Sequence, residues 1–211
     1  REHPQEAVRK DYAIFQRYVK SVKNWNSKIE KYLKSITKRA NEILKDDFKQ
    51  NFEFVLKYTG ANHEITADKF DWKEPFIELQ VPKYEGKMNV VKRAHSFLNE
   101  AKWSAIGLAI RFAIIEDWTN RPNTAELKAL IIDDMLLSLD MCNRDIVLNL
   151  LLDRYVSNYQ MIMLTHDRYF FELTQGKINA RNKGGDWLKL EMYEDEKNGK
   201  KYPLIIKSKT N

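Results

Sequence analysis

The sequence predicts an α/β fold preceded by one long helix, on three observations. Neither Pro nor Gly occurs between Pro4 and Gly60, so the usual helix breakers are absent from a window far longer than an average helix. Two short apolar runs, at 129–132 and 161–164, each end in polar residues and are followed by a segment with helical spacing. Such alternation of strand and helix is typical of a parallel sheet covered by helices. The hydrophobic content of 43% is sufficient for a packed core.

The composition excludes several classes of protein. A chain of 211 residues with 12% aromatic content is neither disordered nor fibrous. No apolar run approaches the roughly 20 residues that cross a bilayer, so we expect no membrane partner. The single cysteine, Cys142, excludes an internal disulfide framework and a multi-thiolate metal site. A cytoplasmic location is the default expectation.

The net charge of +6 is unevenly distributed. Residues 1–58 contain 14 Lys and Arg against 8 Asp and Glu, whereas residues 59–211 contain 22 of each. The whole excess therefore belongs to the amino-terminal part. Its basic residues form one helix face, made of Lys20, Lys23, Lys28, Lys31, Lys34, Lys38 and Arg39. This face is either simply solvated or able to follow a phosphate backbone.

The amino-terminal part has the pattern of a coiled-coil helix, which we place at residues 1–50. Its apolar residues follow alternating steps of four and three, the a/d pattern of a left-handed coiled coil. The positions are Val8, Tyr12, Phe15, Val19, Val22, Asn26, Ile29, Leu33, Ile36, Ala40 and Ile43. The polar member, Asn26, is expected to fix the register of the pairing. A single strand cannot bury such a seam, so a projecting arm with a partner helix is predicted; the alternative is a long helix lying on its own domain.

Residues 51–211 are predicted to form the globular part. Alternation predicts strands at 52–58 and at 76–81, the second bounded by Pro75 and Pro82. A turn is expected at 60–62 and a helix at 101–118. Further elements are expected in the order strand, helix, strand, helix, at 129–132, 143–155, 161–164 and 168–174, with both strands parallel and buried on both faces. A hairpin or edge strands around Asn198 and Gly199 should end the chain.

Polar groups at the carboxyl ends of the two buried strands are the candidate site. Asp133 and Asp134 follow the first strand, and His166 follows the second. Because charged groups at such positions are costly without a cation, we expect Asp133 to hold the hydration shell of Mg²⁺. Asp134 would polarise a water that attacks a γ-phosphate, and His166 would contact the same phosphate.

In order and spacing, four segments resemble the motifs of an ABC ATPase. Residues 130–134 resemble a Walker B strand, 137–140 the D-loop, and 163–167 the switch or H-loop. Residues 98–102, with the helix that follows them, are similar to the ABC signature. With a coiled-coil arm directly before them, they resemble the carboxy-terminal half of an SMC/RecF-type ABC ATPase head.

This resemblance implies a fold, a cofactor set and partners. The fold would be a P-loop NTPase-like carboxy-terminal lobe with a mostly parallel sheet, at 51–211, after the returning arm at 1–50. ATP and Mg²⁺ would bind between two heads, with Asp133 on the metal through water, Asp134 and His166 catalytic, and Asp140 in the D-loop. The signature of one subunit would cap the nucleotide of the other through Leu98, Asn99, Glu100, Ala101 and Lys102. A homodimer acting on DNA in repair, chromosome maintenance or phage defence would follow.

The chain departs from the family pattern at three places. The usual Ser-Gly-Gly of the signature is replaced by 99–101, Asn-Glu-Ala, and Asp134 stands where Glu is commoner, so slow hydrolysis is expected. No Gly-x-x-x-x-Gly-Lys-Ser/Thr loop occurs in the sequence, which predicts that the Walker A lobe is a missing partner and that this chain alone is inactive. Two rival functions are a nucleotide-free coiled-coil dimerisation module and a DNA-binding coiled coil.

Overall fold

The computed structural model describes residues 4–65, 70–91, 97–121, 128–134, 139, 141–197 and 199–208. The chain forms two compact units. Unit 1 consists of Arg1–Lys128 and Leu136–Val147, and unit 2 of Ala129–Met135 and Leu148–Asn211. The long helix and the first strands after it thus belong to the same unit, and a domain division at residue 50 stays a prediction.

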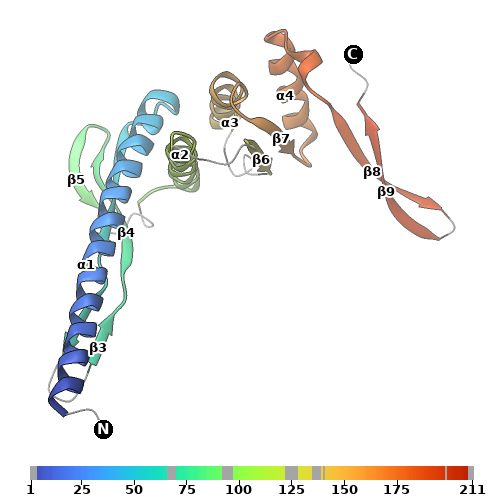
Figure 1. Ribbon diagram of the computed structural model, residues 1–211. Coiled ribbons are helices and arrows are strands. Elements are labelled where there is room, and N and C mark those ends of the chain that lie inside the picture. Colours follow the sequence, from blue (N-terminus) through green and yellow to red (C-terminus); the bar gives the residue numbers. More distant parts are fainter. Residues whose placement is uncertain are drawn as a thin grey trace. The chain divides into compact units, whose positions relative to one another are not determined.

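Unit 1 combines helices with antiparallel strands (Figure 1). Its elements are α1 (Pro4–Glu42) with a terminal π-turn η1 (Ile43–Asp47), β1 (Phe52–Thr59), β2 (Asn62–Ile65), β3 (Phe70–Lys73), β4 (Phe76–Tyr84), β5 (Lys87–Val91), α2 (Glu100–Thr119) and most of α3 (Met141–Leu150). No helix in the described ranges is long and apolar enough to cross a membrane.

The predicted long helix is confirmed as α1. Part of its apolar seam is already buried without a partner chain. The seam residues Ile36, Ala40 and Ile43 are buried within unit 1, against β1 and α2. Farther toward the amino terminus, the Tyr18 ring of α1 lies 6.2 Å from the Trp72 ring of β3. The expectation that a partner helix must cover the seam is therefore wrong for this part of α1, because elements of the same unit cover it.

Asn26 has a different role from the predicted one. Its side-chain amide donates to the carbonyl oxygen of Ala61 at 2.8 Å, and its Oδ1 accepts from the Ala61 N–H and the Tyr58 hydroxyl, each at 3.0 Å. A Cβ built on Gly60 would lie 2.7 Å from this side chain, so glycine is needed for the close approach. Asn26 attaches α1 to the strand that follows within its own unit.

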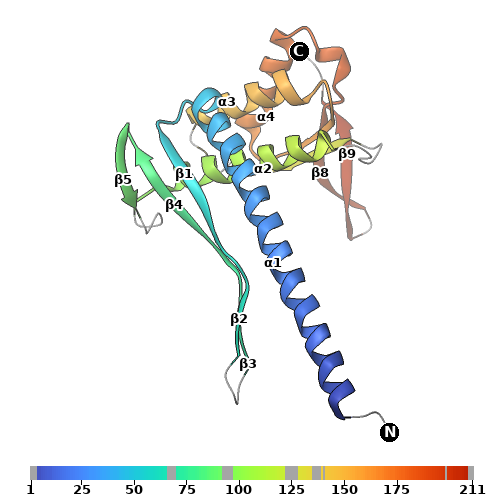
Figure 2. The ribbon, with the colours of Figure 1, turned by 60° about the vertical axis from the view of Figure 1, so that its left-hand side comes forward.

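A long antiparallel ribbon runs beside α1 (Figure 2). β1 pairs with β4, and β2 pairs with β3 farther along the same ribbon. The predicted turn at 60–62 is wrong, since the chain continues in the same direction from β1 into β2. The prediction that Pro82 ends its strand is also wrong: β4 continues to Tyr84, and Pro82 sits at a register shift opposite β5, where a missing N–H is tolerated.

α2 confirms the predicted helix and packs against α1. Asn99 caps it by accepting from the Lys102 N–H at 3.0 Å. Arg39 of α1 reaches Glu116 of α2 with Nε at 2.5 Å and Nη2 at 3.2 Å, a bidentate ion pair. This hydrogen-bonded carboxylate raises the pKa of the Arg39 guanidinium above its usual range. The apolar side of the junction includes an edge-on contact of Phe48 with Phe112.

Unit 2 contains both strands of the predicted alternation, its second helix and the end of its first helix. Its elements are β6 (Ala129–Asp133), the end of α3 with a π-turn η3 (Leu151–Tyr155), β7 (Gln160–Leu164), α4 (Arg168–Ala180), a 3₁₀ turn η4 (Gly184–Asp186), β8 (Leu190–Lys197) and β9 (Lys200–Lys207). β6 and β7 are parallel, as predicted, with Asp133 opposite Leu164. All other strand pairs in the described ranges are antiparallel, so the fold is mixed rather than mostly parallel.

The parallel pair is not buried on both faces, contrary to expectation. Ile132 is buried, but Ile131, Ile162 and Leu164 are 62%, 41% and 49% exposed. Parallel strands usually have both faces covered, so one apolar face of this pair lies open.

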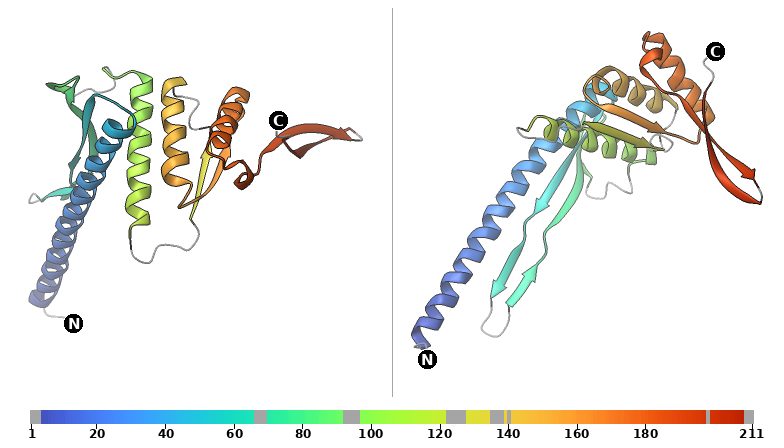
Figure 3. Two further views of the ribbon diagram at one scale, coloured as in Figure 1. Left: turned by 90° about the horizontal axis from the view of Figure 1, so that it is seen from above. Right: turned by 45° about the vertical axis from the view of Figure 1, so that its right-hand side comes forward.

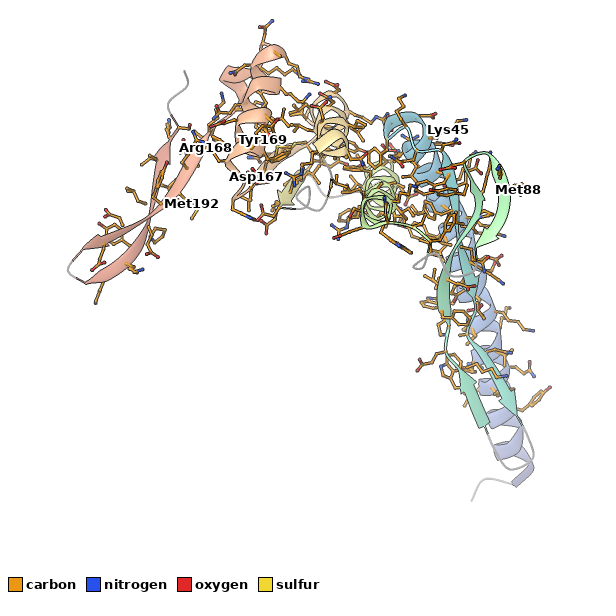
Figure 4. All side chains as sticks on the ribbon, turned by 180° about the vertical axis from the view of Figure 1, so that it is seen from behind. Lys45, Met88, Asp167, Arg168, Tyr169 and Met192 are labelled. Carbon is orange, nitrogen blue, oxygen red and sulfur yellow. The ribbon has the colours of Figure 1, made fainter. Side chains whose placement is uncertain are left out.

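The predicted terminal hairpin is confirmed as β8 and β9 (Figure 3). Gly199 in its turn has φ +69°, which favours glycine. Arg168, at the start of α4, donates to Glu191 of β8 at 2.9 Å and to Glu172 at 2.8 Å, and so ties the hairpin to the helix. Figure 4 labels Arg168 on α4 and Met192 on β8.

Candidate functional site

The carboxyl ends of β6 and β7 place three of the predicted site residues together in unit 2. Asp133 is the last residue of β6, and Asp134 follows it with its N–H bonded to the Leu164 carbonyl at 3.1 Å. This bond continues the parallel pairing by one residue beyond the strand. His166 follows β7 by two residues, so both strands deliver a polar side chain to the same edge.

Asp134 and His166 are in direct contact. His166 Nδ1 lies 2.6 Å from Asp134 Oδ2, and the His166 backbone N–H donates to Asp134 Oδ1 at 3.2 Å. The hydrogen bond from the His166 side chain holds the pKa of the Asp134 carboxyl below its usual range, and the His166 N–H acts in the same direction. With Nδ1 directed at the carboxylate, Nε2 is the ring nitrogen directed elsewhere.

The backbone at Asp134 is in the left-handed region, with φ +45°. Aspartate tolerates this conformation better than most residues because its short side chain bonds locally. The conformation turns the chain sharply after β6, and the bonds to His166 hold it there. Non-glycine residues in this region are often found at functional sites.

The donor set fits a magnesium ion bound mainly through water. Asp133 is exposed at the strand end, where its carboxylate can accept hydrogen bonds from the water shell of such an ion. Within the described ranges no group of three or more His, Cys, Asp or Glu side chains forms a metal cage. Mg²⁺ needs no such cage, because it keeps several waters and is bound by one or two carboxylates together with phosphate.

The loop after β7 is ordered by its own side chains. Thr165 Oγ1 accepts from the Asp167 N–H at 3.1 Å, and Asp167 caps α4 by accepting from the Phe170 N–H at 3.1 Å. Figure 4 labels Asp167 at this helix start. His166 therefore sits between a strand end and a capped helix, which fixes its backbone.

The signature-like segment lies in unit 1, at the start of α2. Leu98 is buried, Asn99 caps the helix, Glu100 is exposed in the first turn, and Ala101 and Lys102 follow in it. The structure thus places these five residues around one helix start. The remaining predicted residue, Asp140, lies outside the described residues.

Lys102 makes a contact that sequence reasoning missed. Its ammonium bonds to the Tyr84 hydroxyl and lies 4.6 Å from the centre of the Tyr84 ring. The Tyr84 ring packs edge-on against Phe97, with centroids 4.6 Å apart. A basic residue among aromatic neighbours was the available signal, but Tyr84 is 18 residues away from Lys102 in sequence.

Comparison with known proteins gives matches among solved structures only. No protein-family model matches the sequence, and no curated protein does. The Smc head domain with an extended coiled coil from Pyrococcus furiosus, bound to the C-terminal domain of ScpA, matches 96% of this chain and 42% of that chain at 13% identity, with a TM-score of 0.50. The SMC head domain from Thermotoga maritima matches 89% of this chain and 52% of that chain at 16% identity, with a TM-score of 0.43.

The Pyrococcus furiosus match decides the fold, because it covers nearly the whole chain. The chain has the fold of an SMC head domain. It spans 42% of that Pyrococcus furiosus chain, which carries an extended coiled coil besides the head. The predicted resemblance to an SMC-type head fragment is confirmed, and at 13% identity the likeness concerns its fold. In this SMC-type fragment, β6, β7 and the residues after them provide the candidate site.

Proposed function

We propose that this SMC-type fragment is the carboxy-terminal half of an ATP-hydrolysing head. The observation that supports it most is the contact between Asp134 and His166 at the ends of two parallel strands, with Asp133 beside them. An acidic pair and a histidine at one sheet edge could supply a magnesium ligand, a group that orients the attacking water and a contact to the phosphate.

Each residue then has a distinct role. Asp133 would hold Mg²⁺ through its water shell, and the ion, when bound, would neutralise phosphate charge. Asp134, kept ionised by its lowered pKa, would orient and polarise the attacking water. His166 is held through Nδ1 and would direct Nε2 toward the terminal phosphate.

A separate lobe would supply the phosphate-binding loop. The open apolar face of β6 and β7 supports this, because Ile131, Ile162 and Leu164 are the kind of side chains that further strands or helices cover. The signature-like start of α2 would act on the nucleotide of a second head, which makes ATP-dependent dimerisation part of the proposal. The replaced glycines at 99–101 favour slow turnover.

We also propose that the parent protein acts on DNA, in repair, chromosome maintenance or defence. Exposed lysines line the α1 face opposite its seam, among them Lys20, Lys31 and Lys38. A row of positive charge of this kind attracts a phosphate backbone.

The test is ATP turnover by the full-length gene product that contains this sequence, with and without duplex DNA. Asp134→Asn should lower turnover by about 10²- to 10⁴-fold while ATP binding and ATP-dependent dimerisation persist, since only the group that activates water is lost. Asp133→Ala should weaken the dependence on Mg²⁺. The present chain alone should show no turnover, and duplex DNA should raise the rate of the full-length protein.

The matched control is Asp186→Asn, which makes the same change at an exposed aspartate of η4 in the same unit. It should leave turnover unchanged. The enzymatic proposal fails if Asp134→Asn turns over ATP within twofold of the wild type. If the full-length protein neither binds ATP nor dimerises with it, the nucleotide-free dimerisation module replaces this proposal.

A further inference from the structure

The contact between Lys102 and Tyr84 joins the signature-like start of α2 to the end of β4. The Lys102 ammonium donates to the Tyr84 hydroxyl and lies 4.6 Å from the centre of the Tyr84 ring. A lysine side chain at a protein surface normally samples many rotamers, so this pairing costs conformational entropy. A hydrogen bond from a charged group and a cation–π contact both act against that cost. The two interactions restrict where the ammonium can lie.

Tyr84 is itself held in place by its neighbours in unit 1. Its ring stacks on Phe52 of β1 with ring centroids 6.3 Å apart, and it meets Phe97 edge-on at 4.6 Å. The chain directly after it is fixed too, because the Glu85 N–H donates to the Asn51 carbonyl oxygen at 2.8 Å. The hydroxyl of Tyr84 is therefore held at a fixed position beside the start of α2.

The other side chains of segment 98–102 are poorly suited to recognise a phosphate. The glycines of the family pattern are replaced, and Asn99 Oδ1 is used to cap α2. Glu100, exposed in the first turn, adds a negative charge that repels a phosphate. Lys102 has the one positive side chain of the segment. Its ammonium has three N–H donors, and the Tyr84 hydroxyl accepts one of them, so Lys102 can also donate to a phosphate oxygen.

We propose that Tyr84 is a positioning residue for Lys102, whose ammonium, in place of glycine N–H groups, contacts the terminal phosphate of a nucleotide held by a second head. This inference rests on the proposed ATPase function and adds the residue that orients the contact between the two heads. Tyr84 acts through Lys102 and does not touch the nucleotide. Loss of its hydroxyl should therefore weaken ATP-dependent dimerisation and leave nucleotide binding by a single head unchanged.

The first measurement needs neither ATP nor a second head. In the present chain, NMR relaxation of the lysine ε-carbons reports how mobile each lysine side chain is. The ε-carbon of Lys102 should be more rigid than that of the exposed Lys87. Tyr84→Phe should raise its mobility, because the hydroxyl is lost while the ring remains, and circular dichroism should show the variant folded. If the mobility of the Lys102 ε-carbon does not change, the positioning role is wrong, whatever the full-length protein does with ATP.

The second measurement is dimerisation of the full-length gene product that contains this sequence, followed by analytical ultracentrifugation with the slowly hydrolysed analogue ATPγS. Tyr84→Phe should raise the dimer dissociation constant by about three- to tenfold, as expected for the loss of one hydrogen bond. Lys102→Ala should raise it by more than about tenfold, because the whole charge is lost. The double variant should match Lys102→Ala, since the hydroxyl has no effect once the ammonium is absent. The affinity of the monomer for a fluorescent ATP analogue should be the same in all variants.

The matched control is Tyr58→Phe, the same change at another half-buried tyrosine of the same sheet, whose hydroxyl donates to Asn26. It should dimerise like the wild type. A double variant weaker than Lys102→Ala alone would mean that Tyr84 acts through the fold, and would overturn the positioning role. If the wild type dimerises with ATPγS and Tyr84→Phe does so equally well, this inference alone fails. A wild type that neither binds the analogue nor dimerises with it overturns the ATPase proposal and this inference together.

Discussion

Asp134 combines three features that are unusual in one residue: a left-handed backbone, a backbone bond to the neighbouring strand, and two bonds to His166. The lowered pKa of its carboxyl has a consequence for stability with pH. Because the folded-state pKa lies below that of the unfolded chain, the contact stabilises the fold above the usual aspartate range. That contribution is lost as the pH falls through the lowered pKa.

The first prediction concerns the source of this shift. His166→Ala should raise the pKa of the Asp134 carboxyl toward its usual range, since the side-chain hydrogen bond from His166 lowers it most. NMR titration of the side-chain carboxyl carbons measures this. Asp153, whose pKa is lowered by its bond to Arg181, is the internal control. Its titration should be unchanged by His166→Ala and raised by Arg181→Ala. An Asp134 titration that stays low without His166 would assign the shift to another group.

At the scale of elements, α1 is attached to the ribbon by two asparagines that bond to backbone on or just beyond β1. Asn26 bonds to both the N–H and the carbonyl of Ala61, and Asn41 does the same with Phe54, at 3.0 and 2.8 Å. β1 is an edge strand of its sheet, so its outer backbone groups need partners. The two side chains supply them and fix how α1 lies along the ribbon.

The second prediction distinguishes two roles of Asn26: attaching α1 to the ribbon within unit 1, or fixing the register between two coiled-coil chains. Asn26→Leu should destabilise unit 1 by about 1–3 kcal/mol, because buried backbone groups of Ala61 lose their partners. Asn24→Leu, at an exposed position of the same helix, should change stability by less than about 0.5 kcal/mol. Urea unfolding measures both. A coiled-coil register role predicts the opposite: a more stable helix pairing and a changed oligomeric state for Asn26→Leu.

An element could be predicted from the sequence where the pattern that identifies it lies within its own residues. The spacing within α2, the apolar runs of β6 and β7, and the Asn-Gly turn between β8 and β9 each identify their element without knowledge of the rest. The placement of Asp134 and His166 at one sheet edge also follows, since parallel strands end there. Their direct hydrogen bond was not predicted. The role of Asn26 could not be predicted, because its partner lies 35 residues away and its heptad position favours another explanation. The continuation of β4 through Pro82 could not be predicted either, because a register shift that tolerates proline has no sequence signature.

For the whole molecule, the two units differ in how fully they bury their apolar side chains. Unit 1 buries α2, the end of α1 and β1 together, with Phe54 and Phe112 fully enclosed. In unit 2 the parallel pair has Ile132 on its covered face and Ile131 on its open face. This chain spans 42% of the Pyrococcus furiosus chain that shares its fold. The candidate site lies beside this open face, and this position is the basis of our proposal that a separate lobe completes the site.

The third prediction tests whether the face of β6 and β7 that carries Ile131 is exposed to solvent. Ile131→Lys should change the stability of the present chain by less than about 0.5 kcal/mol, because its side chain already contacts water. Ile132→Lys, the neighbouring change on the covered face, should unfold unit 2, since it places an unpaired charge in the core. Thermal unfolding compares the two. Binding of the dye bis-ANS should also fall in Ile131→Lys, because the exposed apolar patch becomes charged. Equal destabilisation by both changes would mean that the chain covers this face itself, and the argument for a separate lobe there would be lost.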